Sequence, residues 1–326
     1  MGDPAGIGPE IVLKALAGDG LWSVCRPVII GDYECLKRAA GVSQIDFDYE
    51  AVSVEGLSGH LSGFEKLICD LKNVPAGLTP GSESAAAGAA SAEYISTAAA
   101  LCQSKAIDAI ATAPINKRSF NAGGYDFPGH TEFLAKLTNS DEFSMSFFAG
   151  KLRVVLLSTH ISLLEAIGLV KKESLCSLIR FTSRELKVLL GREIKIAVAG
   201  LNPHASEGGM FGAEEADEIE PAIRECRELH GINVSGPYSP DTVFIRGFEG
   251  EFDAVVSCYH DQATIAVKCL SFGKAVNVTL GLPIIRTSVD HGTAFDIAGQ
   301  NMAECGSMEA AIKLAAELAG FKSGTA

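Results

Sequence analysis

Three histidines stand at or just beyond the ends of apolar, strand-like runs and are the first candidates for chemistry. They are His160, His204 and His260. Loops at the carboxyl ends of parallel strands carry the sites of α/β enzymes, and neutral imidazoles bind Zn, Mn, Co or Fe in preference to Ca. The three residues lie far apart in the sequence and form no local metal-binding motif. Metal ligation and structural hydrogen bonding therefore both remain open for them.

A second set of side chains could bind an anionic substrate. His130 and Thr131 lie at the expected amino end of a helix, where they act either as a cap or as substrate contacts. Later basic and amide side chains could hold a phosphate and a carboxylate, and an arginine can do so with two hydrogen bonds. For each of these side chains, the simpler interpretation is a surface residue without a role in binding. These residues are Lys268, Asn277 and Arg286.

Polar residues also follow two of the predicted strands directly. His260, Asp261 and Gln262 come behind an apolar run, and residues 202–205 followed by 208–209 form a comparable flexible strand exit. Polar groups are costly to bury without partners. The 260–262 cluster therefore either caps its strand or lines a site, and we favour the site.

The first residues form a Gly-rich loop that leads into a helix. Residues 2–11 could hold an anion on free backbone N–H groups, but they match neither the dinucleotide nor the P-loop signature. A tight structural turn is the favoured reading. A strand would ordinarily precede such a loop, so we expect the natural chain to begin before Met1.

The elements that must position these residues alternate between strands and helices. Apolar runs rich in β-branched residues predict strands covered on both faces. Helices are predicted at 9–17, at 85–103 and at 214–230, where acids in the first turns suit the helix dipole. The alternation predicts an α/β protein with mainly parallel sheets. The predicted strands are 26–30, 109–113, 152–158, 194–200, 254–257 and 275–279.

The composition is that of a soluble globular protein. The 326 residues are 47% hydrophobic and 21% charged, enough for one large domain or two ordinary ones. The net charge of −13, without a dense basic cluster, speaks against nucleic-acid binding. Nine cysteines without a C-x-x-C pair disfavour a disulfide framework and favour a reducing, cytoplasmic setting. We find no signal peptide and no apolar run of the roughly 18 residues that a membrane span needs.

The two ends of the chain, at 6–10 and 291–299, resemble the isocitrate and isopropylmalate dehydrogenases. A closer resemblance is to the 4-hydroxythreonine-4-phosphate dehydrogenase family of pyridoxal phosphate biosynthesis. The motifs of that family occur in order across essentially the whole chain, and the last block is long and specific. The matching stretches are residues 1–11, 112–117, 129–132, 159–160, 202–205, 259–262 and 277–299.

This resemblance implies a two-lobed α/β fold with mainly parallel sheets and an active-site cleft between the lobes. The first lobe, on the cofactor side, would comprise residues 1–128 and 270–326. The second lobe, on the metal and dimer side, would comprise residues 129–269. The resemblance also implies a homodimer whose active site is shared across the interface, with no nucleic acid and no membrane among its partners.

The resemblance assigns a role to each candidate residue. The family's ligands for one divalent ion, Zn, Mg, Mn or Co, fall on His160, His204 and His260. Its substrate contacts fall on His130, Thr131, Lys268, Asn277 and Arg286. The loop for NAD or NADP contains Gly292, Thr293 and Asp296. Lys117 and Asp241 follow predicted strand exits and are candidates for the proton acceptor, although either could instead belong to a structural ion pair.

The implied reaction is the NAD(P)-linked oxidation of 4-phosphohydroxy-L-threonine to a β-keto acid, which decarboxylates to 3-amino-2-oxopropyl phosphate. A bound divalent ion would lower the pKa of the substrate hydroxyl.

Departures from the family pattern at Ser206, at 210–211 and at 263–264 weaken the exact substrate assignment. D-threonate 4-phosphate, D-erythronate 4-phosphate and a cis-dihydrodiol are the alternatives. A phosphate acyltransferase of similar fold is a different class that needs no imidazole triad, so metal content separates the two. The chain keeps all of the polar site residues that the resemblance assigns, and this disfavours an inactive binding protein.

Overall fold

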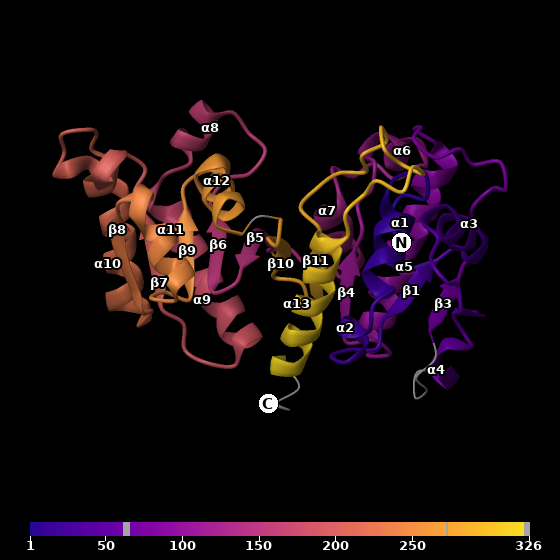
Figure 1. The fold of residues 1–326 in the computed structure, drawn as a ribbon. Helices are drawn as coiled ribbons and strands as arrows, with labels where there is room; N and C mark the ends of the chain where they lie inside the picture. The colour runs from indigo at the N-terminus through magenta and orange to yellow at the C-terminus, as the bar shows by residue number, and fades with distance from the viewer. Residues whose placement is uncertain (61–65, 272, 323–326) are drawn as a thin grey trace. The chain divides into compact units, whose positions relative to one another are not determined.

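The computed structural model shows a chain that divides into two compact units. Unit 1 comprises Met1–Asp141 and Leu282–Ala319, and unit 2 consists mainly of Glu142–Gly281. In each unit helices alternate with strands that are mostly parallel, which confirms the predicted α/β class (Figure 1). The structure describes residues 1–60, 66–271 and 273–322.

The units do not divide where the lobes were expected from the sequence. The expected boundary at 128/129 falls just before α7 (His130–Leu137), which lies in unit 1. The expected boundary at 269/270 falls inside α12 (His260–Ser271), which lies in unit 2. The unit boundaries follow tertiary contacts, and these need not coincide with breaks between the sequence motifs. Parts of the expected first lobe lie outside the described residues, namely 61–65, 272 and 323–326.

Unit 1 contains a three-stranded parallel sheet and a parallel pair of strands. In the pair, Arg286 stands opposite Ile110 and Ser288 stands opposite Thr112. This register places Arg286 close to the start of the loop that carries Lys117. The sheet consists of β1 (Val28–Gly31), β3 (Leu67–Asp70) and β2 (Glu50–Val52), and the pair consists of β4 (Ala109–Thr112) and β11 (Ile285–Ser288).

Helix α5 (Ala85–Gln103) is the Ala-rich helix that the sequence predicts. Gly88 lies so close to α6 (Lys117–Ala122) that a Cβ atom there would stand 1.8 Å from the carbonyl oxygen of Ser119. A residue without a side chain is therefore required at this contact. The close packing of α5 against α6 fixes the first turn of α6, where Lys117 stands.

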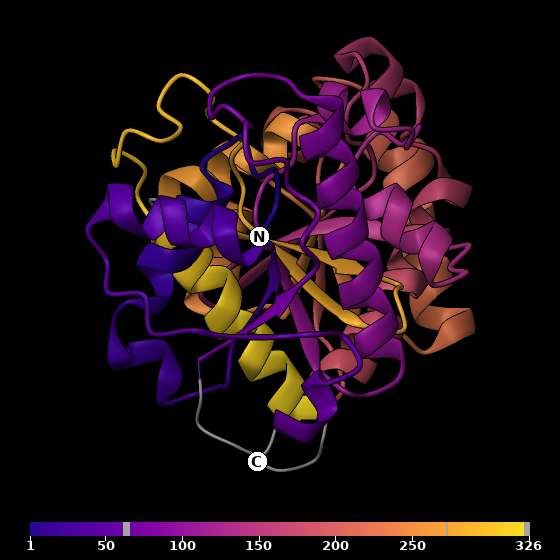
Figure 2. The ribbon, with the colours of Figure 1, turned by 90° about the vertical axis from the view of Figure 1, so that its right-hand side faces the viewer.

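The first and last helices of the chain contribute to one hydrophobic core in unit 1. Figure 2 shows the last helix in yellow beside the indigo helices of the N-terminal segment. Ile11 and Leu13 of α1 (Gly8–Leu16) are fully buried, and Met308 of α13 (Gly306–Lys322) packs into the same cluster. Burial of this kind stabilises a protein by roughly 1.5–3 kcal/mol for each large apolar side chain. The core anchors the Gly-rich loop that precedes α1.

Unit 2 has one antiparallel strand within an otherwise parallel arrangement. β6, β9 and β7 are parallel neighbours in that order, so their carboxyl ends lie at one edge of the sheet. The loops that carry His160, His260 and His204 leave from this edge. The strands are β5 (Ser144–Ala149), which is antiparallel to β6 (Leu152–Leu156) and to β10 (Val276–Leu280), together with β9 (Ala254–Ser257), β7 (Ile196–Ala199) and β8 (Val234–Tyr238).

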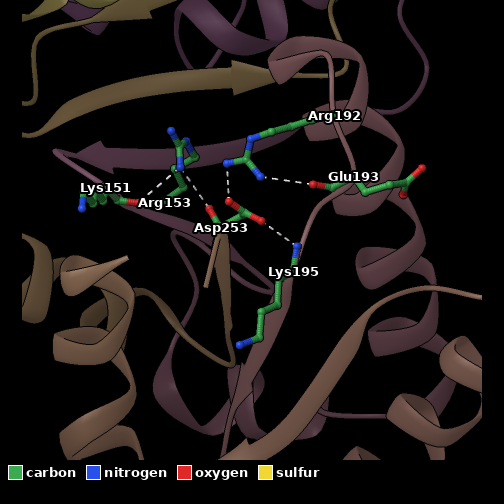
Figure 3. Close-up of polar contacts among 6 residues, drawn as sticks. All are labelled: Lys151, Arg153, Arg192, Glu193, Lys195 and Asp253. Atoms are coloured by element: carbon green, nitrogen blue, oxygen red, sulfur yellow. Dashed lines mark hydrogen bonds and ion pairs between the residues drawn. The ribbon is translucent and has the colours of Figure 1, made fainter. Parts of the chain in front are cut away.

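An ion-paired cluster fastens the opposite edge of this sheet (Figure 3). Asp253 accepts hydrogen bonds from the Arg192 guanidinium at 2.5 Å and from the backbone N–H of Lys195 at 2.7 Å. Arg153 donates to the backbone carbonyls of Lys151 and Asp253 at 3.3 and 3.4 Å. These contacts join the segments that lead into β6, β7 and β9. They hold the three strands in register at the end remote from the histidines.

One of the helices predicted from the sequence is observed as two consecutive helical elements. The segment predicted as one helix at 214–230 begins with a π-helical turn, η2 (Glu215–Ile219), and continues as α10 (Glu220–His230). Among the described residues, no helix is both long and apolar enough to cross a membrane. The others are α2 (Asp19–Trp22), α3 (Tyr33–Ser43), α4 (Leu57–His60), α8 (Leu163–Gly168), α9 (Lys172–Leu190), η1 (Pro203–Glu207) and α11 (Pro240–Glu249).

Candidate active site

His160 and His260 lie close together beyond the ends of β6 and β9. Their ring centroids are 5.6 Å apart and their ring planes are inclined by 45°. Both line a cavity of about 780 Å³ in unit 2, together with Asp241 and Tyr259. Two imidazoles that bind one ion at Zn–N distances of about 2.0–2.1 Å have centroids roughly 5 Å apart. The spacing of this pair therefore fits two ligands of one metal ion.

A neighbouring carboxylate orients the His260 ring. Asp261 Oδ1 lies 2.7 Å from His260 Nδ1, so the carboxylate accepts the proton of that nitrogen. The lone pair is then on Nε2, which is the nitrogen available to a metal. Carboxylates commonly hold metal-binding histidines in this way and raise their basicity. The contact is a second observation that fits the pair to a metal ion.

The structure does not bring His204 to the His160–His260 pair within one chain. His204 is exposed in η1, and the neighbouring ring, that of Phe211, has its centroid 6.4 Å away. Across the described part of the chain, no three His, Cys, Asp or Glu side chains converge on a common metal position. One chain therefore presents two imidazoles together and a third apart from them.

The backbone around His204 is strained. His204, Ala205, Ser206 and Glu207 have φ values of 54°, 50°, 71° and 47°, in the left-handed region. Each such non-glycine residue costs roughly 1–2 kcal/mol. The conformation persists only where the surroundings impose it, and such strain is concentrated at functional sites. We call residues 200–215, which form this strained loop and its base, the His204 hairpin.

Arg286 in unit 1 is almost completely buried, with 3% of its surface exposed. Its Nε and Nη2 atoms donate to Thr112 Oγ1 at 3.2 and 2.9 Å. Burial lowers the pKa of Arg286 to about 10, so the guanidinium stays charged at neutral pH. A buried, oriented guanidinium is well suited to bind phosphate or carboxylate.

His130 begins α7 near Arg286, and as a whole residue it is partly exposed. Burial, and then the positive charge of Arg286, lowers the pKa of His130 well below the usual value of 6.5, so the imidazole is neutral at pH 7. Its Nε2 atom is buried and has no hydrogen-bond partner among the described residues. Thr131, the next residue, is also buried. The first turn of α7 thus presents polar groups whose hydrogen-bonding capacity is not used within unit 1.

Lys117 is the remaining candidate in unit 1. An ideal Cβ on Gly129 would lie 3.9 Å from Lys117 Cε and 3.6 Å from Glu132 Oε2, so the Lys117 side chain reaches the turn before α7. Lys268 and Asn277 lie in unit 2. Lys268 is exposed on α12, and Asn277 on β10 has a buried Oδ1 that finds no hydrogen-bond donor in the described residues.

The Gly-rich loop at the start of the chain is a tight turn whose N–H groups are occupied. Ala5 N–H donates to Asp3 Oδ1 at 2.8 Å, and Gly6 N–H donates to the Asp3 carbonyl at 3.0 Å. Ile7 N–H donates to the carbonyl of Thr293 at 3.0 Å. Because these donors are occupied, the structure favours the tight turn over an anion site.

The same contacts place the loop expected to bind the nucleotide. Thr293 is buried against Gly6, where a Cβ atom would stand 2.9 Å from Thr293 Cβ. Gly292 and Asp296, on the two sides of Thr293, are exposed. An exposed carboxylate beside an exposed glycine suits a ribose hydroxyl and a closely approaching backbone. These residues therefore fit a nucleotide, and Thr293 fastens their loop to the start of α1.

Sequence patterns alone assign no role to Thr112, which holds Arg286, or to Glu215, which lies at the base of the His204 hairpin. Thr112 ends a strand and reads as an ordinary β-branched residue. Glu215 reads as one of several acids that favour a helix start, but it is buried. The signal for both is a polar side chain that the fold buries, which depends on tertiary structure.

Comparison with known proteins places this geometry in a family. The sequence model of pyridoxal phosphate biosynthetic protein PdxA matches residues 23–315. The chain belongs to the PdxA family. D-threonate 4-phosphate dehydrogenase from Cupriavidus necator is 45% identical over 320 residues, which cover 98% of this chain and 96% of that protein. For 4-hydroxythreonine-4-phosphate dehydrogenase from Desulfosudis oleivorans the identity is 43% over 320 residues, with 98% and 94% covered.

A solved structure agrees with this assignment. The crystal structure of 4-hydroxythreonine-4-phosphate dehydrogenase from Klebsiella pneumoniae superposes with a TM-score of 0.89 at 40% identity, over 98% of both chains. The resemblance that the sequence motifs indicate is thereby confirmed. Both names of these relatives refer to a phosphorylated hydroxy acid, and the acid differs between the two names.

Proposed function

We propose that this chain is a metal-assisted, NAD(P)-linked dehydrogenase of a phosphorylated hydroxy acid. The observation that carries the proposal is the His160–His260 pair, which has the spacing of two ligands of one ion and lines a cavity with Asp241. Relatives named as dehydrogenases of 4-hydroxythreonine 4-phosphate and D-threonate 4-phosphate support the same class of reaction. The substrate that we propose first is 4-phosphohydroxy-L-threonine.

In the proposed reaction the secondary alcohol of the substrate becomes a ketone. The hydrogen on carbon leaves as hydride to NAD or NADP, and the hydroxyl proton leaves to a base. The product is a β-keto acid, which loses carbon dioxide to give 3-amino-2-oxopropyl phosphate. When bound, one divalent ion (Zn, Mg, Mn or Co) would lower the pKa of the hydroxyl, and the residues that would hold it are His160, His204 and His260.

Five of the candidate residues are proposed to bind the phosphate and the carboxylate of the substrate. Arg286 supplies a fixed positive charge, and neutral His130 and Thr131 supply hydrogen-bonding groups beside it. Asn277 and Lys268 supply an amide and a second cation from unit 2. A buried polar atom without a partner costs roughly 1–3 kcal/mol. Satisfying His130 Nε2 and Asn277 Oδ1 would therefore favour substrate binding.

Asp241 is the proton acceptor that we favour. It lines the cavity that contains His160 and His260, and its carboxylate accepts a hydrogen bond from the Ser239 hydroxyl. Lys117, the other candidate, lies beside Gly129 and Glu132 in unit 1. That position suits substrate binding as well as proton transfer. For the nucleotide, we propose contacts with Gly292, Thr293 and Asp296.

We propose further that His204 completes the metal site of a second copy of the chain in a homodimer. His204 is exposed and held apart from the other two histidines of its own chain. Leu163 and Ile265 are exposed apolar side chains that line the same cavity. A second copy would cover these side chains, which are otherwise costly to leave in water. Neither nucleic acid nor a membrane is part of the proposal.

A substrate panel tests the reaction. The purified chain with 4-phosphohydroxy-L-threonine and NAD or NADP should generate reduced-cofactor absorbance at a rate that chelator abolishes. D-threonate 4-phosphate is the second candidate, because the Cupriavidus necator relative carries that name at 45% identity. It has a hydroxyl where the first substrate has an amino group, so its decarboxylated product carries no amine. Turnover of this substrate alone would overturn the first choice and keep the class.

A cytoplasmic location is a further part of the proposal. It is supported by the odd number of cysteines and by the lack of a C-x-x-C pair in the sequence. Fractionation of cells that express the natural gene would test it, with recovery in an extracellular or envelope fraction as the contrary result.

A further inference from the structure

Two buried polar side chains of unit 2 lie next to the histidine loops without being candidate ligands. Glu215 is 2% exposed and Gln262 is 9% exposed. Buried polar groups are costly unless they are hydrogen-bonded. Both side chains bind backbone groups of the loops that carry the histidines, and Glu215 also binds the side chain of Asn202.

Gln262 bridges the loops of His260 and His204. Its Oε1 atom accepts a hydrogen bond from Cys258 N–H at 2.8 Å, just before His260. Its Nε2 atom donates to the carbonyl of Gly200 at 2.7 Å, at the point where β7 leads into the His204 hairpin. A single amide therefore fixes the separation of the two strand exits.

Glu215 holds the other side of the same exit. Its Oε1 atom accepts hydrogen bonds from the N–H groups of Leu201 and Asn202 at 2.8 and 2.7 Å, and its Oε2 atom accepts one from Asn202 Nδ2 at 2.9 Å. An ideal Cβ on Gly200 would lie 2.9 Å from Ala205 Cα and 3.2 Å from Glu215 Oε1. The hairpin is folded tightly over this carboxylate.

The third histidine loop is joined to the same set of contacts. Ser158 Oγ donates to the carbonyl of Cys258 at 3.2 Å, and both residues are buried. A path of contacts thus runs from Ser158 through Cys258 and Gln262 to Gly200, and from the adjoining residues to Glu215. It touches the backbone a few residues before each of His160, His260 and His204.

We propose that Glu215 and Gln262 are positioning residues. They set where the His204 hairpin of each chain stands, and so how its His204 is presented to the His160–His260 pair of the second copy. This inference rests on the proposed metal site. The hairpin has four successive non-glycine residues in left-handed conformations, which its own sequence does not favour. Contacts outside the four strained residues must therefore select the conformation, and Glu215, at the base of the hairpin, accepts three of the hydrogen bonds that do so. Metal affinity depends on both side chains, although neither contacts the ion.

The experiment measures binding of Co²⁺ to the purified full chain by its visible absorption, and of Zn²⁺ by competition. Glu215→Gln and Gln262→Met should weaken affinity by about 10–100-fold, the range for residues that support metal ligands. Activity lost in these variants should return as the metal concentration is raised, because the anion-binding residues of unit 1 are unchanged. Glu214→Gln is the matched control, since the Glu214 carboxylate accepts from Asn202 Nδ2 but not from the N–H groups of Leu201 and Asn202, which stay bound to Glu215.

Gln262→Glu provides a second test if Gln262→Met does not fold. The carboxylate can still accept from Cys258 N–H, but it places an oxygen against the Gly200 carbonyl in place of a donor, so we expect a loss of affinity at least as large as in Gln262→Met. Folded Glu215→Gln and Gln262 variants that bind metal as tightly as the unmodified chain would overturn the positioning role alone. Failure of the unmodified chain to bind metal would overturn the proposed function as well. Lost activity that added metal does not restore would also count against the positioning role.

Discussion

The residues of unit 1 that we propose to bind the substrate anions and the histidines of unit 2 that we propose to bind a metal ion are held in different ways. Arg286 is buried, and Thr112 accepts hydrogen bonds from two of its nitrogens, so its direction is fixed within one unit. In unit 2, His160 and His260 lie together, but His204 is exposed on a strained hairpin apart from them. Under the proposed function, the anion site would be formed within one chain, whereas the metal site would need a second copy.

Replacement of a histidine of the pair should have the largest effect. His260→Ala removes one ligand and the orienting contact with Asp261. We expect loss of bound metal and a fall in kcat of about 1,000-fold or more, because a metal ion contributes several kcal/mol to such reactions. Metal analysis and steady-state kinetics measure the two effects. His230→Ala, at the exposed end of α10, is the control, and retention of metal by His260→Ala would contradict the site.

Replacement of the buried arginine should affect substrate binding rather than metal content. Arg286→Lys keeps a positive charge but loses the planar group that two hydrogen bonds hold on Thr112. We expect KM to rise by roughly 30-fold, equivalent to about 2 kcal/mol for a lost charged hydrogen bond. Arg227→Lys on α10 is a matched control. An unchanged KM would remove Arg286 from the anion site.

Loss of the acceptor for Arg286 should have a smaller effect of the same kind. Thr112→Val keeps the size of the side chain and removes the oxygen that accepts from Nε and Nη2. A rise in KM of about 5-fold corresponds to roughly 1 kcal/mol. Thr112→Ser retains the hydroxyl and should retain most of the affinity. Equal behaviour of the Val and Ser variants would show that the hydroxyl does not orient Arg286.

The buried imidazole of His130 should make stability depend on pH. Burial, then the charge of Arg286, lowers its pKa well below 6.5, so the folded chain keeps it neutral while the unfolded chain binds a proton below about pH 6.5. The free energy of unfolding should therefore fall as pH drops from 7 to 5, by at most about 1.4 kcal/mol per pH unit from this group. Denaturant unfolding of His130→Gln should show a shallower fall. An identical slope in both proteins would contradict the buried, neutral state.

Much of the fold could be predicted because buried parallel strands and the Ala-rich helix have simple sequence patterns. Two of the strands that were not predicted lack those patterns. β11 carries Arg286, Thr287 and Ser288, polar residues that are buried only because β4 and the surrounding helices cover them. β5 begins with the polar stretch Ser144 to Ser146 and is antiparallel within a parallel neighbourhood. These positions are decided by tertiary pairing, which a local pattern does not contain.

The sequence could predict which residues belong to the candidate site, but not which of them lie close together. The three histidines follow strands, which indicates one edge of a sheet. That His160 meets His260 follows from the pairing of β6 with β9, and sequence order does not give that pairing. Glu215 looks like a helix-start acid, and its role as an anchor depends on a left-handed hairpin of ordinary residues. The separation of His204 from the pair likewise appears only in the structure.

Mixed dimers test the central claim most directly. Chains that carry His160→Ala and chains that carry His204→Ala should each be inactive alone, and they can be coexpressed with different tags and purified together. If one site takes His160 and His260 from one chain and His204 from the other, each mixed dimer contains one intact site. With random pairing about half of the dimers are mixed, and one of the two sites in each mixed dimer is intact. The activity of the whole mixture should therefore return to about a quarter of the unmodified level. Activity that stays at the level of the single variants, in dimers shown to contain both chains, would contradict the shared metal site.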